Sequence, residues 1–471
     1  MKNKALYSIM GLGVFTTLNA PTSAATTKED TKLPNVIFIL ADDLGYGDLG
    51  CYGQEKFKTP NIDKLSENGV QFMQNYAGAP VSAPSRTSIM TGRHTGHSPI
   101  RGNKGYRDDD GRMYDYILPD EEITLGEIFK SRSYTTACIG KWGMGGPNTE
   151  GNPNAQGFDY AFGYLSQSHA HSYFPAYIHE NNKEIELNEN EYTHDLAEDK
   201  ALEFIKENRK NPFFLYLAFT IPHAELCISP EYMTKYDGRF PETPFERKGT
   251  YGAQEQPRAA FASMIERLDL SVGRVIDLLE KYGLDENTLV IFTSDNGAHC
   301  EGGADPEFFN STGIFRGIKR DLYEGGIRVP LIASWKGTIA PGVKNNDPVA
   351  FWDILPTCAE IIGAETPRYC DGLSLLSLLK SGETPKRDYL YWEFCMQGGK
   401  QALLMGDWKL IGLQLQYKDK CRYELYNLAN DPSETTDLAT QEPKRVKQML
   451  DIMMSARTAN PDFPLFTNEI K

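Results

Sequence analysis

Positive charge is scarce in this sequence of 471 residues. Its 49 lysines and arginines face 64 aspartates and glutamates, which leaves a formal net charge of −15. A nucleic-acid-binding protein needs a basic face to displace counterions from phosphates, so the deficit argues against nucleic acid as a partner. An anionic small molecule would also be repelled overall, and its binding would require cations placed locally.

Cysteine pairs that could hold a metal are missing as well. The eight cysteines lie far apart and none forms a C-x-x-C pair, which argues against a cysteine-type zinc site. Histidine is equally scarce, with eight in the chain. The proportions of 40% hydrophobic and 24% charged residues are nevertheless those of an ordinary globular protein.

Long hydrophobic runs are absent too. The apolar stretch over residues 5–18 is shorter than the roughly 20 residues that a membrane-spanning helix needs. Lys2 and Lys4 precede it, and small residues follow it around Ala24, as in a secretory signal peptide. We therefore expect a signal peptide over residues 1–24, cleavage near Ala24, and a periplasmic or secreted protein without a membrane span.

Several continuous apolar runs predict strands that are buried on both faces of a parallel sheet. These runs cover residues 35–41, 134–139, 213–220, 289–293 and 329–334. Helical patterns lie between them, most clearly over residues 259–282, where Gly283 is a suitable C-terminal stop. Alternating strands and helices indicate an α/β fold with a large, mostly parallel sheet flanked by helices.

The pattern changes near residue 386. Short apolar runs separated by turn residues then predict a small antiparallel sheet, followed by a helix over residues 445–457. We therefore expect two domains in the mature chain, a catalytic domain over residues 33–385 and a C-terminal subdomain over residues 386–471.

Polar residues follow four of the predicted strands. They are Asp42-Asp43, Gly140-Lys141, Pro222-His223 and Ser294-Asp295-Asn296. Ligands of open α/β sheets bind at the carboxyl ends of the strands, so these groups predict a site there, although any one pair could serve as a cap or turn. The oxygen ligands of Asp42, Asp43, Asp295 and Asn296 suit Ca²⁺ or Mg²⁺ better than zinc.

A Ser-x-Pro-x-Arg segment lies between the first two strands. Pro84 suits the first turn of a helix, which places Ser82 at or near a helix N-terminus. That position favours anions and an activated nucleophile, and Arg86 lies one turn further on. A serine that merely caps the helix is the structural alternative.

These motifs resemble those of the type I, formylglycine-dependent sulfatases of the alkaline phosphatase superfamily, especially exported bacterial glycan sulfatases. Beside residues 82–86 (SAPSR) and 91–93 (TGR), the matching segments occur in the family's order along nearly the whole mature chain. They are residues 35–48, 59–63, 140–143, 222–223, 294–297, 323–330, 424–428 and 431–434.

The resemblance implies a role for each matching residue. Ser82 would be converted to formylglycine, whose hydrate attacks sulfur, by a sulfatase-maturing enzyme. Ca²⁺, rather than Mg²⁺, would be held by Asp42, Asp43, Asp295 and Asn296 together with residue 82. The remaining catalytic side chains would bind the formylglycine and sulfate oxygens or flank the bridging oxygen; they are Arg86, Lys141, His223 and Lys319.

The sequence departs from the family pattern at two positions. Many members have cysteine where this chain has Ser82, and many have histidine where it has Gly143. If Ser82 stays unmodified, two alternatives are open: a phosphate or phosphonate ester hydrolase that uses the serine directly, or an inactive protein that binds sulfated glycans.

The substrate implied by the resemblance is a glycan with sulfated galactose or N-acetylgalactosamine. His171, in a loop, is a candidate for contact with a sugar hydroxyl, and His299 is a second candidate. Arg101 and Asn103 follow the nucleophile region and are candidates to line the pocket, with a structural role as the alternative.

Overall fold

The computed structural model describes residues 33–469, which form one compact unit. The predicted signal peptide lies outside this range. Within the range, no helix combines the length and the apolar character needed to cross a membrane. The eight cysteines, all within the described range, are free thiols.

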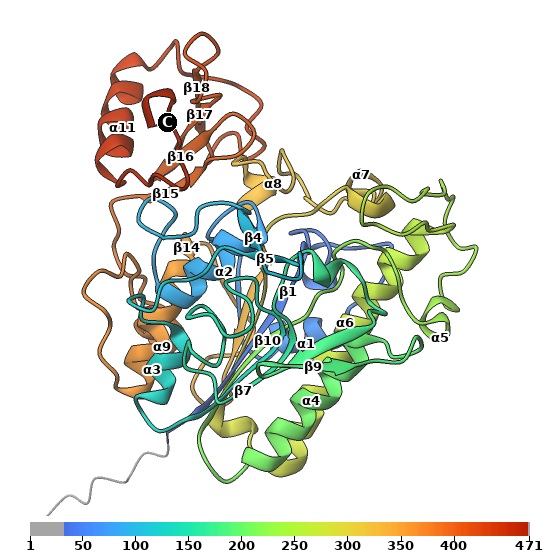
Figure 1. Cartoon of the computed structure of the whole chain (residues 1–471). Helices are drawn as coiled ribbons and strands as arrows, with labels where there is room; N and C mark the ends of the chain where they lie inside the picture. The colour runs from blue at the N-terminus through green and yellow to red at the C-terminus, as the bar shows by residue number, and fades with distance from the viewer. Residues whose placement is uncertain (1–32, 470–471) are drawn as a thin grey trace, which may run out of the picture. The chain divides into compact units, whose positions relative to one another are not determined.

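A large sheet of ten strands forms the centre of the fold (Figure 1). Its strand order is β13-β2-β12-β11-β1-β10-β6-β7-β8-β9. The strands, in chain order, are β1 (Asn35–Ala41), β2 (Val70–Phe72), β6 (Thr135–Lys141), β7 (Tyr160–Tyr164), β8 (Tyr177–Glu180), β9 (Lys183–Glu186), β10 (Phe213–Ala218), β11 (Thr288–Ser294), β12 (Leu331–Ser334) and β13 (Val343–Asn345).

The central strands are parallel and in close register. β1 pairs with β10 on one side and with β11 on the other, and β6 pairs with β10. Ala41 lies opposite Ser294, and Leu40 lies opposite Ala218. Because parallel strands end at one edge, the residues that follow β1, β10 and β11 emerge side by side. The sheet is mixed, since β12 is antiparallel to β11.

Helices cover both faces of this sheet (Figure 1). Alternate residues of β1 explain why: Ile37 and Ile39 belong to one hydrophobic cluster, and Val36 and Phe38 to the other. The first face is covered by α1 (Pro60–Glu67), α4 (Thr193–Asn208) and α6 (Pro257–Tyr282); the second is covered by α2 (Ser82–Thr91), α3 (Leu125–Lys130) and α9 (Ile354–Ile362). The predicted α/β architecture is confirmed.

A separate antiparallel sheet follows near the C-terminus, as the sequence predicts. It consists of β15 (Leu390–Phe394), β16 (Lys400–Met405), β17 (Trp408–Leu413) and β18 (Arg422–Asn427), and α11 (Pro443–Ser455) covers one face. Trp392 on the other face packs against Trp352 and Tyr76. The boundary between residues 385 and 386 stays a prediction.

The remaining elements are short. They are β3 (Asn75–Tyr76), β4 (Gly105–Arg107), β5 (Met113–Asp115), β14 (Val349–Ala350), α5 (Pro230–Met233), α7 (Pro306–Phe309), α8 (Glu324–Ile327) and α10 (Leu376–Ser381).

A pair of leucines on α6 tests the packing of the central sheet. Leu268 is fully buried, whereas Leu270 on the same helix is 40% exposed. We expect Leu268→Ala to lower the free energy of unfolding by about 2–5 kcal/mol, because it leaves a cavity. Leu270→Ala should change it by about 0.5 kcal/mol or less. Urea unfolding of both variants measures the difference, and equal losses would contradict the assigned core.

Candidate active site

Four oxygen-bearing side chains meet at the carboxyl edge of the large sheet. Asp42 and Asp43 follow β1, and Asp295 and Asn296 follow β11, which lies beside it. The backbone N–H of Asp43 donates to Asp295 Oδ1 over 3.0 Å, and Asn296 Nδ2 donates to Asp43 Oδ1 over 2.7 Å. All four residues are fully buried. The structure therefore brings together the four residues that the sequence nominated for a cation.

The donor set fits a hard divalent cation. Asn296 Oδ1 is buried and has no hydrogen-bond partner within residues 33–469, so it is free to act as a ligand. The neighbouring groups are carboxylates, and such oxygen sets suit Ca²⁺ and Mg²⁺. Asp43 has a positive φ of 63°, a conformation that costs energy for a residue other than glycine and that gathers at functional sites.

Three buried cations neutralise these carboxylates. Arg86 donates to Asp295 Oδ2 from both Nε and Nη2, over 3.0 and 2.9 Å. Lys141 Nζ lies 2.6 Å from Asp42 Oδ2, and Lys319 Nζ lies 2.6 Å from Asp43 Oδ2. Burial opposes the charge of Lys319, but the nearby carboxylates outweigh it and raise the pKa of its ammonium above the usual value. Lys319 therefore remains protonated at neutral pH.

Ser82 is the first residue of α2, in agreement with the sequence prediction. Its side chain does not cap the helix; Oγ donates to Asp42 Oδ1 over 3.1 Å, and Lys141 Nζ lies 3.4 Å from the same oxygen. The helix N-terminus adds partial positive charge at this point. An anion next to residue 82 would thus meet a helix N-terminus and a lysine together.

His223 and Lys319 form a pair beside Asp43. His223 Nδ1 is hydrogen-bonded to the carbonyl of Ala224, which can only accept, so the ring proton sits on Nδ1. Nε2 therefore carries a lone pair, and Lys319 Nζ lies 3.1 Å from it. Burial, reinforced by the neighbouring lysines, lowers the pKa of His223 far below its usual value. The pair is a neutral imidazole beside an ammonium.

His171 and His299 flank His223 in a stack of three imidazole rings. The centroid of His223 is 5.0 Å from that of His171 and 5.8 Å from that of His299. His299 is buried, its Nε2 is bonded to the carbonyl of Pro222, and its Nδ1 lies 3.2 Å from Glu301. His171 is half-buried and so less enclosed than His223 and His299, which makes it the member of the stack that a sugar can reach.

Arg101 and Asn103 are not among these groups. The guanidinium of Arg101 is buried and donates to Glu393 on β15 and to the carbonyl of Thr458, over 2.7 Å each. Arg101 therefore links the segment after α2 to the C-terminal sheet. This is the structural role given above as the alternative to lining the pocket. Asn103 is exposed on the following loop. For both residues, a pocket-lining role rests on sequence proximity alone.

Gln167 occupies the space next to Gly143, the position that departs from the family pattern. A Cβ on residue 143 would lie 1.9 Å from Gln167 Nε2, and Gly143 has a positive φ of 80°. Gln167 Nε2 is buried without a hydrogen-bond partner among the described residues, and the Gln167 backbone is held by Asp115 over 2.7 Å. No sequence motif marks Gln167, because this contact depends on tertiary packing.

Glu301 is a further charged residue at the site, and the sequence reasoning missed it; its partner Arg320 follows Lys319 and was expected near the site by resemblance. A carboxylate oxygen of Glu301 lies 3.8 Å from Lys319 Nζ, and the other oxygen pairs with Arg320. Arg320 has a positive φ of 78° and a side chain that is 36% exposed. The available signal for Glu301 was its place two residues after His299 in the sequence.

Comparison with known proteins agrees with this geometry. The Sulfatase family matches residues 34–364, which is more than half of the chain. The chain belongs to the sulfatase family. Accordingly, it is a sulfuric ester hydrolase. A second family, described as N-sulphoglucosamine sulphohydrolase, C-terminal, matches residues 313–459, a range that includes the whole small sheet and α11.

Similar proteins include animal and bacterial sulfatases. Steryl-sulfatase of Rattus norvegicus is 30% identical over 432 residues, covering 74% of this chain and 70% of that protein. N-acetylgalactosamine-6-O-sulfatase of Bacteroides thetaiotaomicron is 28% identical, covering 97% of this chain and all of that protein. The crystal structure of Ps i-CgsB in complex with k-i-k-neocarrahexaose matches with a TM-score of 0.79 at 28% identity, covering 93% and 96% of the two chains.

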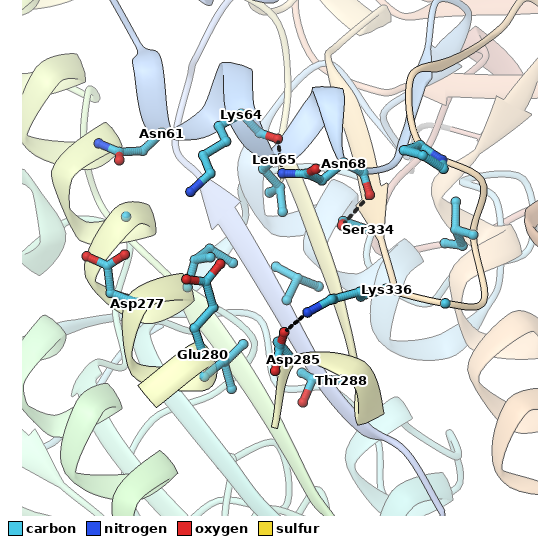
Figure 2. A pocket seen from close by; sticks show the side chains of 17 residues that line it. Asn61, Lys64, Leu65, Asn68, Asp277, Glu280, Asp285, Thr288, Ser334 and Lys336 are labelled. Atoms are coloured by element: carbon cyan, nitrogen blue, oxygen red, sulfur yellow. Dashed lines mark hydrogen bonds and ion pairs between the residues drawn. The ribbon is translucent and has the colours of Figure 1, made fainter. Parts of the chain in front are cut away.

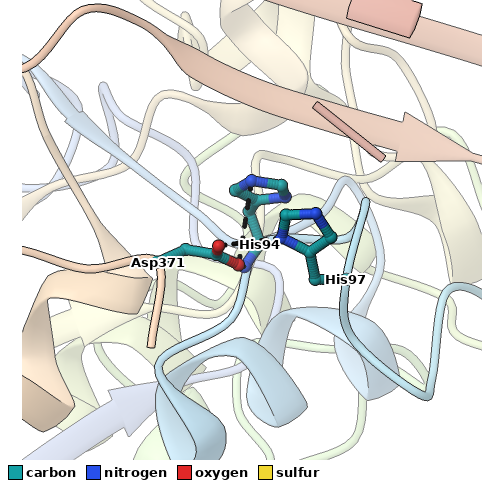
Figure 3. Close-up of side chains that lie close together, drawn as sticks. All are labelled: His94, His97 and Asp371. Carbon is teal, nitrogen blue, oxygen red and sulfur yellow. Dashed lines mark hydrogen bonds and ion pairs between the residues drawn. The ribbon is translucent and has the colours of Figure 1, made fainter. Parts of the chain in front are cut away.

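A second histidine cluster in the sulfatase lies outside this site and contains His94, His97 and Asp371 (Figure 3). The N–H of Gly96 donates to His94 Nδ1 over 3.1 Å, so the His94 ring proton sits on Nε2, 3.7 Å from Asp371. His97 Nδ1 lies 2.8 Å from the same carboxylate. A metal-ligating histidine donates its other N–H, which His94 Nδ1 cannot do while it accepts. The cluster is therefore a hydrogen-bonded link between the segments after α2 and α9.

A cavity of about 400 Å³ is also separate from the site (Figure 2). It lies between α1, α6 and the segment after β12, and an ion pair of Lys336 with Asp285, 2.7 Å long, crosses its wall. Its lining includes Thr288, the first residue of β11, whereas Asp295 follows the last residue. The cavity is thus at the opposite end of the strand from the charged cluster.

The His94 cluster predicts a pH dependence of stability. Burial, together with the charges of His97 and Arg101, outweighs the attraction of Asp371 and lowers the pKa of His94 to about 4 from an ordinary value of 6.5. As the pH falls below 6.5, His94 of the unfolded chain becomes protonated, whereas His94 of the folded chain stays neutral until about pH 4. The stabilisation is therefore complete above pH 6.5 and is lost as the pH falls towards 4.

Urea unfolding of the unaltered sulfatase and of His94→Gln measures this effect. Between about pH 7 and about pH 4.5, we expect the unaltered protein to lose about 2 kcal/mol more than the variant. The comparison uses the change with pH, so a lower starting stability of the variant does not matter. Equal losses in the two proteins would contradict a neutral, buried His94.

Proposed function

We propose that this sulfatase is exported to the periplasm or the medium and removes O-sulfate groups from a glycan containing sulfated galactose or N-acetylgalactosamine. The signal-peptide pattern of residues 1–24 supports export. The names of related N-acetylgalactosamine-6-sulfatases support the sugar. The observation that carries the proposal is the convergence of Ser82, the acidic cluster and three buried cations at one edge of the sheet.

Ser82 is proposed to be converted to formylglycine by a sulfatase-maturing enzyme. The hydrated aldehyde would supply the hydroxyl that attacks sulfur. The position of residue 82 supports this role, because it combines the N-terminus of α2 with Lys141 Nζ at 3.4 Å. A sulfate ester placed there would have its negative oxygens next to Lys141 and Arg86.

A Ca²⁺ ion, in preference to Mg²⁺, is proposed as the metal. Asp42, Asp43, Asp295 and Asn296 would hold it together with residue 82. It would supply positive charge where the sulfate oxygens gain negative charge. The unpartnered Oδ1 of Asn296 and the all-oxygen donor set support the assignment.

Lys319 and His223 are proposed to act at the bridging oxygen. A sugar alkoxide is a poor leaving group, and a positioned acid contributes roughly 10²–10⁴-fold to such a step. Lys319 keeps its proton, and the lone pair on His223 Nε2 holds that ammonium in place from 3.1 Å. The proton would pass from Lys319 Nζ to the departing oxygen.

On the sugar side, His171 is proposed to contact a hydroxyl. Its Nδ1 is bonded to Thr250 over 2.9 Å, and its Nε2 has no hydrogen-bond partner within residues 33–469. Burial lowers the pKa of His171 to about 3, so the ring is neutral. His299 is proposed to support this contact indirectly. It packs on His223 and so keeps the three stacked rings in place.

Mass spectrometry of the native protein tests the nucleophile. We expect the peptide that contains residue 82 to be lighter than its serine form by two hydrogen atoms. Ser82→Ala should lower sulfate release from the sulfated sugars by roughly 10³-fold or more. Ser377→Ala, an exposed serine on α10, is the control that should keep full activity.

An active native protein with unmodified Ser82 would contradict the formylglycine and favour direct use of the hydroxyl, as in a phosphate or phosphonate ester hydrolase. An unmodified protein that binds sulfated glycans without cleaving them would contradict the catalytic proposal as a whole.

Asn296→Ala tests the metal site. We expect Ca²⁺ to bind the unaltered protein and raise its Tm. The variant lacks one oxygen ligand, so its Kd for Ca²⁺ in calorimetry should rise roughly tenfold, a loss of about 1.4 kcal/mol. Asn345→Ala, at the end of β13, is a matched control. If Asn296→Ala binds Ca²⁺ as tightly as the control does, the assignment is wrong.

A further inference from the structure

A small hairpin over residues 245–254 lies in the long connection between α5 and α6, at the right of Figure 1. Phe245 pairs with Gln254, and Lys248 pairs with Tyr251, both in antiparallel bridges. Gly249, with φ of +63°, is the first of the two turn residues, the position at which a type II′ hairpin requires glycine. The turn fixes the direction of the side chains on either side of it.

The tip of this hairpin rests on the histidine wall of the active site. Thr250 Oγ1 lies 2.9 Å from His171 Nδ1. The ring of Tyr251 lies 5.1 Å from that of His171 and 6.3 Å from that of His223. His223 in turn lies 3.1 Å from Lys319. A continuous series of contacts therefore connects the turn to the groups proposed to act at the bridging oxygen.

The hydroxyl of Tyr251 is free to bind a ligand. It has no hydrogen-bond partner among the described residues, and the charges of Lys319, Glu301 and Arg320 act on it. Burial raises the pKa of Tyr251 above its usual value, so the hydroxyl is protonated and can donate. A half-buried ring with a free donor is suited to a sugar, which has both apolar and hydroxyl faces.

Lys248 shares a face of the hairpin with Tyr251. Residues directly opposite in an antiparallel pair direct their side chains to the same face. Lys248 is exposed and has no ion-pair partner among residues 33–469. Lys248 is therefore an exposed cation without an ion-pair partner in the described range, on the hairpin whose tip contacts His171, and it is available to bind an anion.

We propose that the hairpin recognises the substrate beyond its sulfate group. Tyr251 contacts the sugar that carries the scissile sulfate, and Lys248 binds an anionic group on the neighbouring sugar. The inference rests on the proposed function and narrows its substrate to a polyanionic glycan. The anionic group is a sulfate or a carboxylate, which the experiment separates.

Three disaccharides test Lys248. Each has a terminal O-sulfated galactose or N-acetylgalactosamine, and the neighbouring sugar carries a second sulfate, a carboxylate or no charge. We expect the unaltered enzyme to have a kcat/KM about fivefold higher for a charged neighbour, the upper limit for one exposed ion pair. Raised salt should reduce the advantage.

Lys248→Ala should lose this fivefold preference, while Lys183→Ala should keep it. Lys183 is a matched control because it is also an exposed lysine beside a two-residue turn, between β8 and β9. Whichever charged neighbour loses its advantage in Lys248→Ala identifies the anion. An unchanged preference in Lys248→Ala overturns the proposal.

Tyr251→Phe tests the hydroxyl without removing the ring that packs on His171. We expect kcat/KM for the sulfated sugar to fall about three- to tenfold through a higher KM, as for one lost hydrogen bond. Tyr417→Phe, a tyrosine that is 49% exposed in the C-terminal region, is the control. An unchanged KM in Tyr251→Phe contradicts the sugar contact.

The measurements distinguish a wrong assignment of the sulfatase function from a wrong assignment of substrate recognition to the hairpin. In the first case the unaltered protein releases no sulfate from any of the three disaccharides. Calorimetry of these disaccharides with the unaltered protein, Lys248→Ala and Lys183→Ala then decides the hairpin alone. Equal Kd values for the charged disaccharide in the two variants would reject it, and a Kd about fivefold weaker in Lys248→Ala would support it.

Discussion

The mutual neutralisation of buried charges at one edge of the large sheet is the constraint on which the active site depends. Asp42, Asp43 and Asp295 are fully buried, and each carboxylate is paired with a lysine or an arginine. Removing one partner of a buried ion pair leaves an uncompensated charge, which costs about 3–5 kcal/mol. The strands, the start of α2 and the loop that carries Lys319 are therefore held in place by the same contacts that form the site.

The sequence predicted the fold and the centre of the site because both depend on local patterns. Uninterrupted apolar runs mark strands that are covered on both faces, and the parallel register of β1 and β11 brings Asp43 and Asn296 together. The end of each central strand can be predicted from the sequence, at the point where the apolar run stops. Once the order of parallel strands is known, the meeting of their ends follows from geometry.

The periphery of the site could not be predicted in this way. Arg101 lies near Ser82 in the sequence, yet its guanidinium pairs with Glu393, which is 292 residues further on. Tyr251 and Gln167 reach the site or its neighbourhood from separate loops, with no spacing that would reveal it. Such contacts depend on how loops pack on the finished sheet, and a loop has no periodicity from which its path can be deduced.

The deep burial of Ser82 bears on whether the residue can be modified before or after the chain folds. Its side chain is enclosed by Asp42, which follows β1, and by Lys141 at the end of β6, and the cluster is complete only when Asp295 and Lys319 have joined. The residue is only 2% exposed once folded. If Ser82 is modified as proposed, the modifying enzyme would have to reach it on a nascent or unfolded chain. Slower closure of the sheet would then lengthen the interval in which the proposed modification could occur.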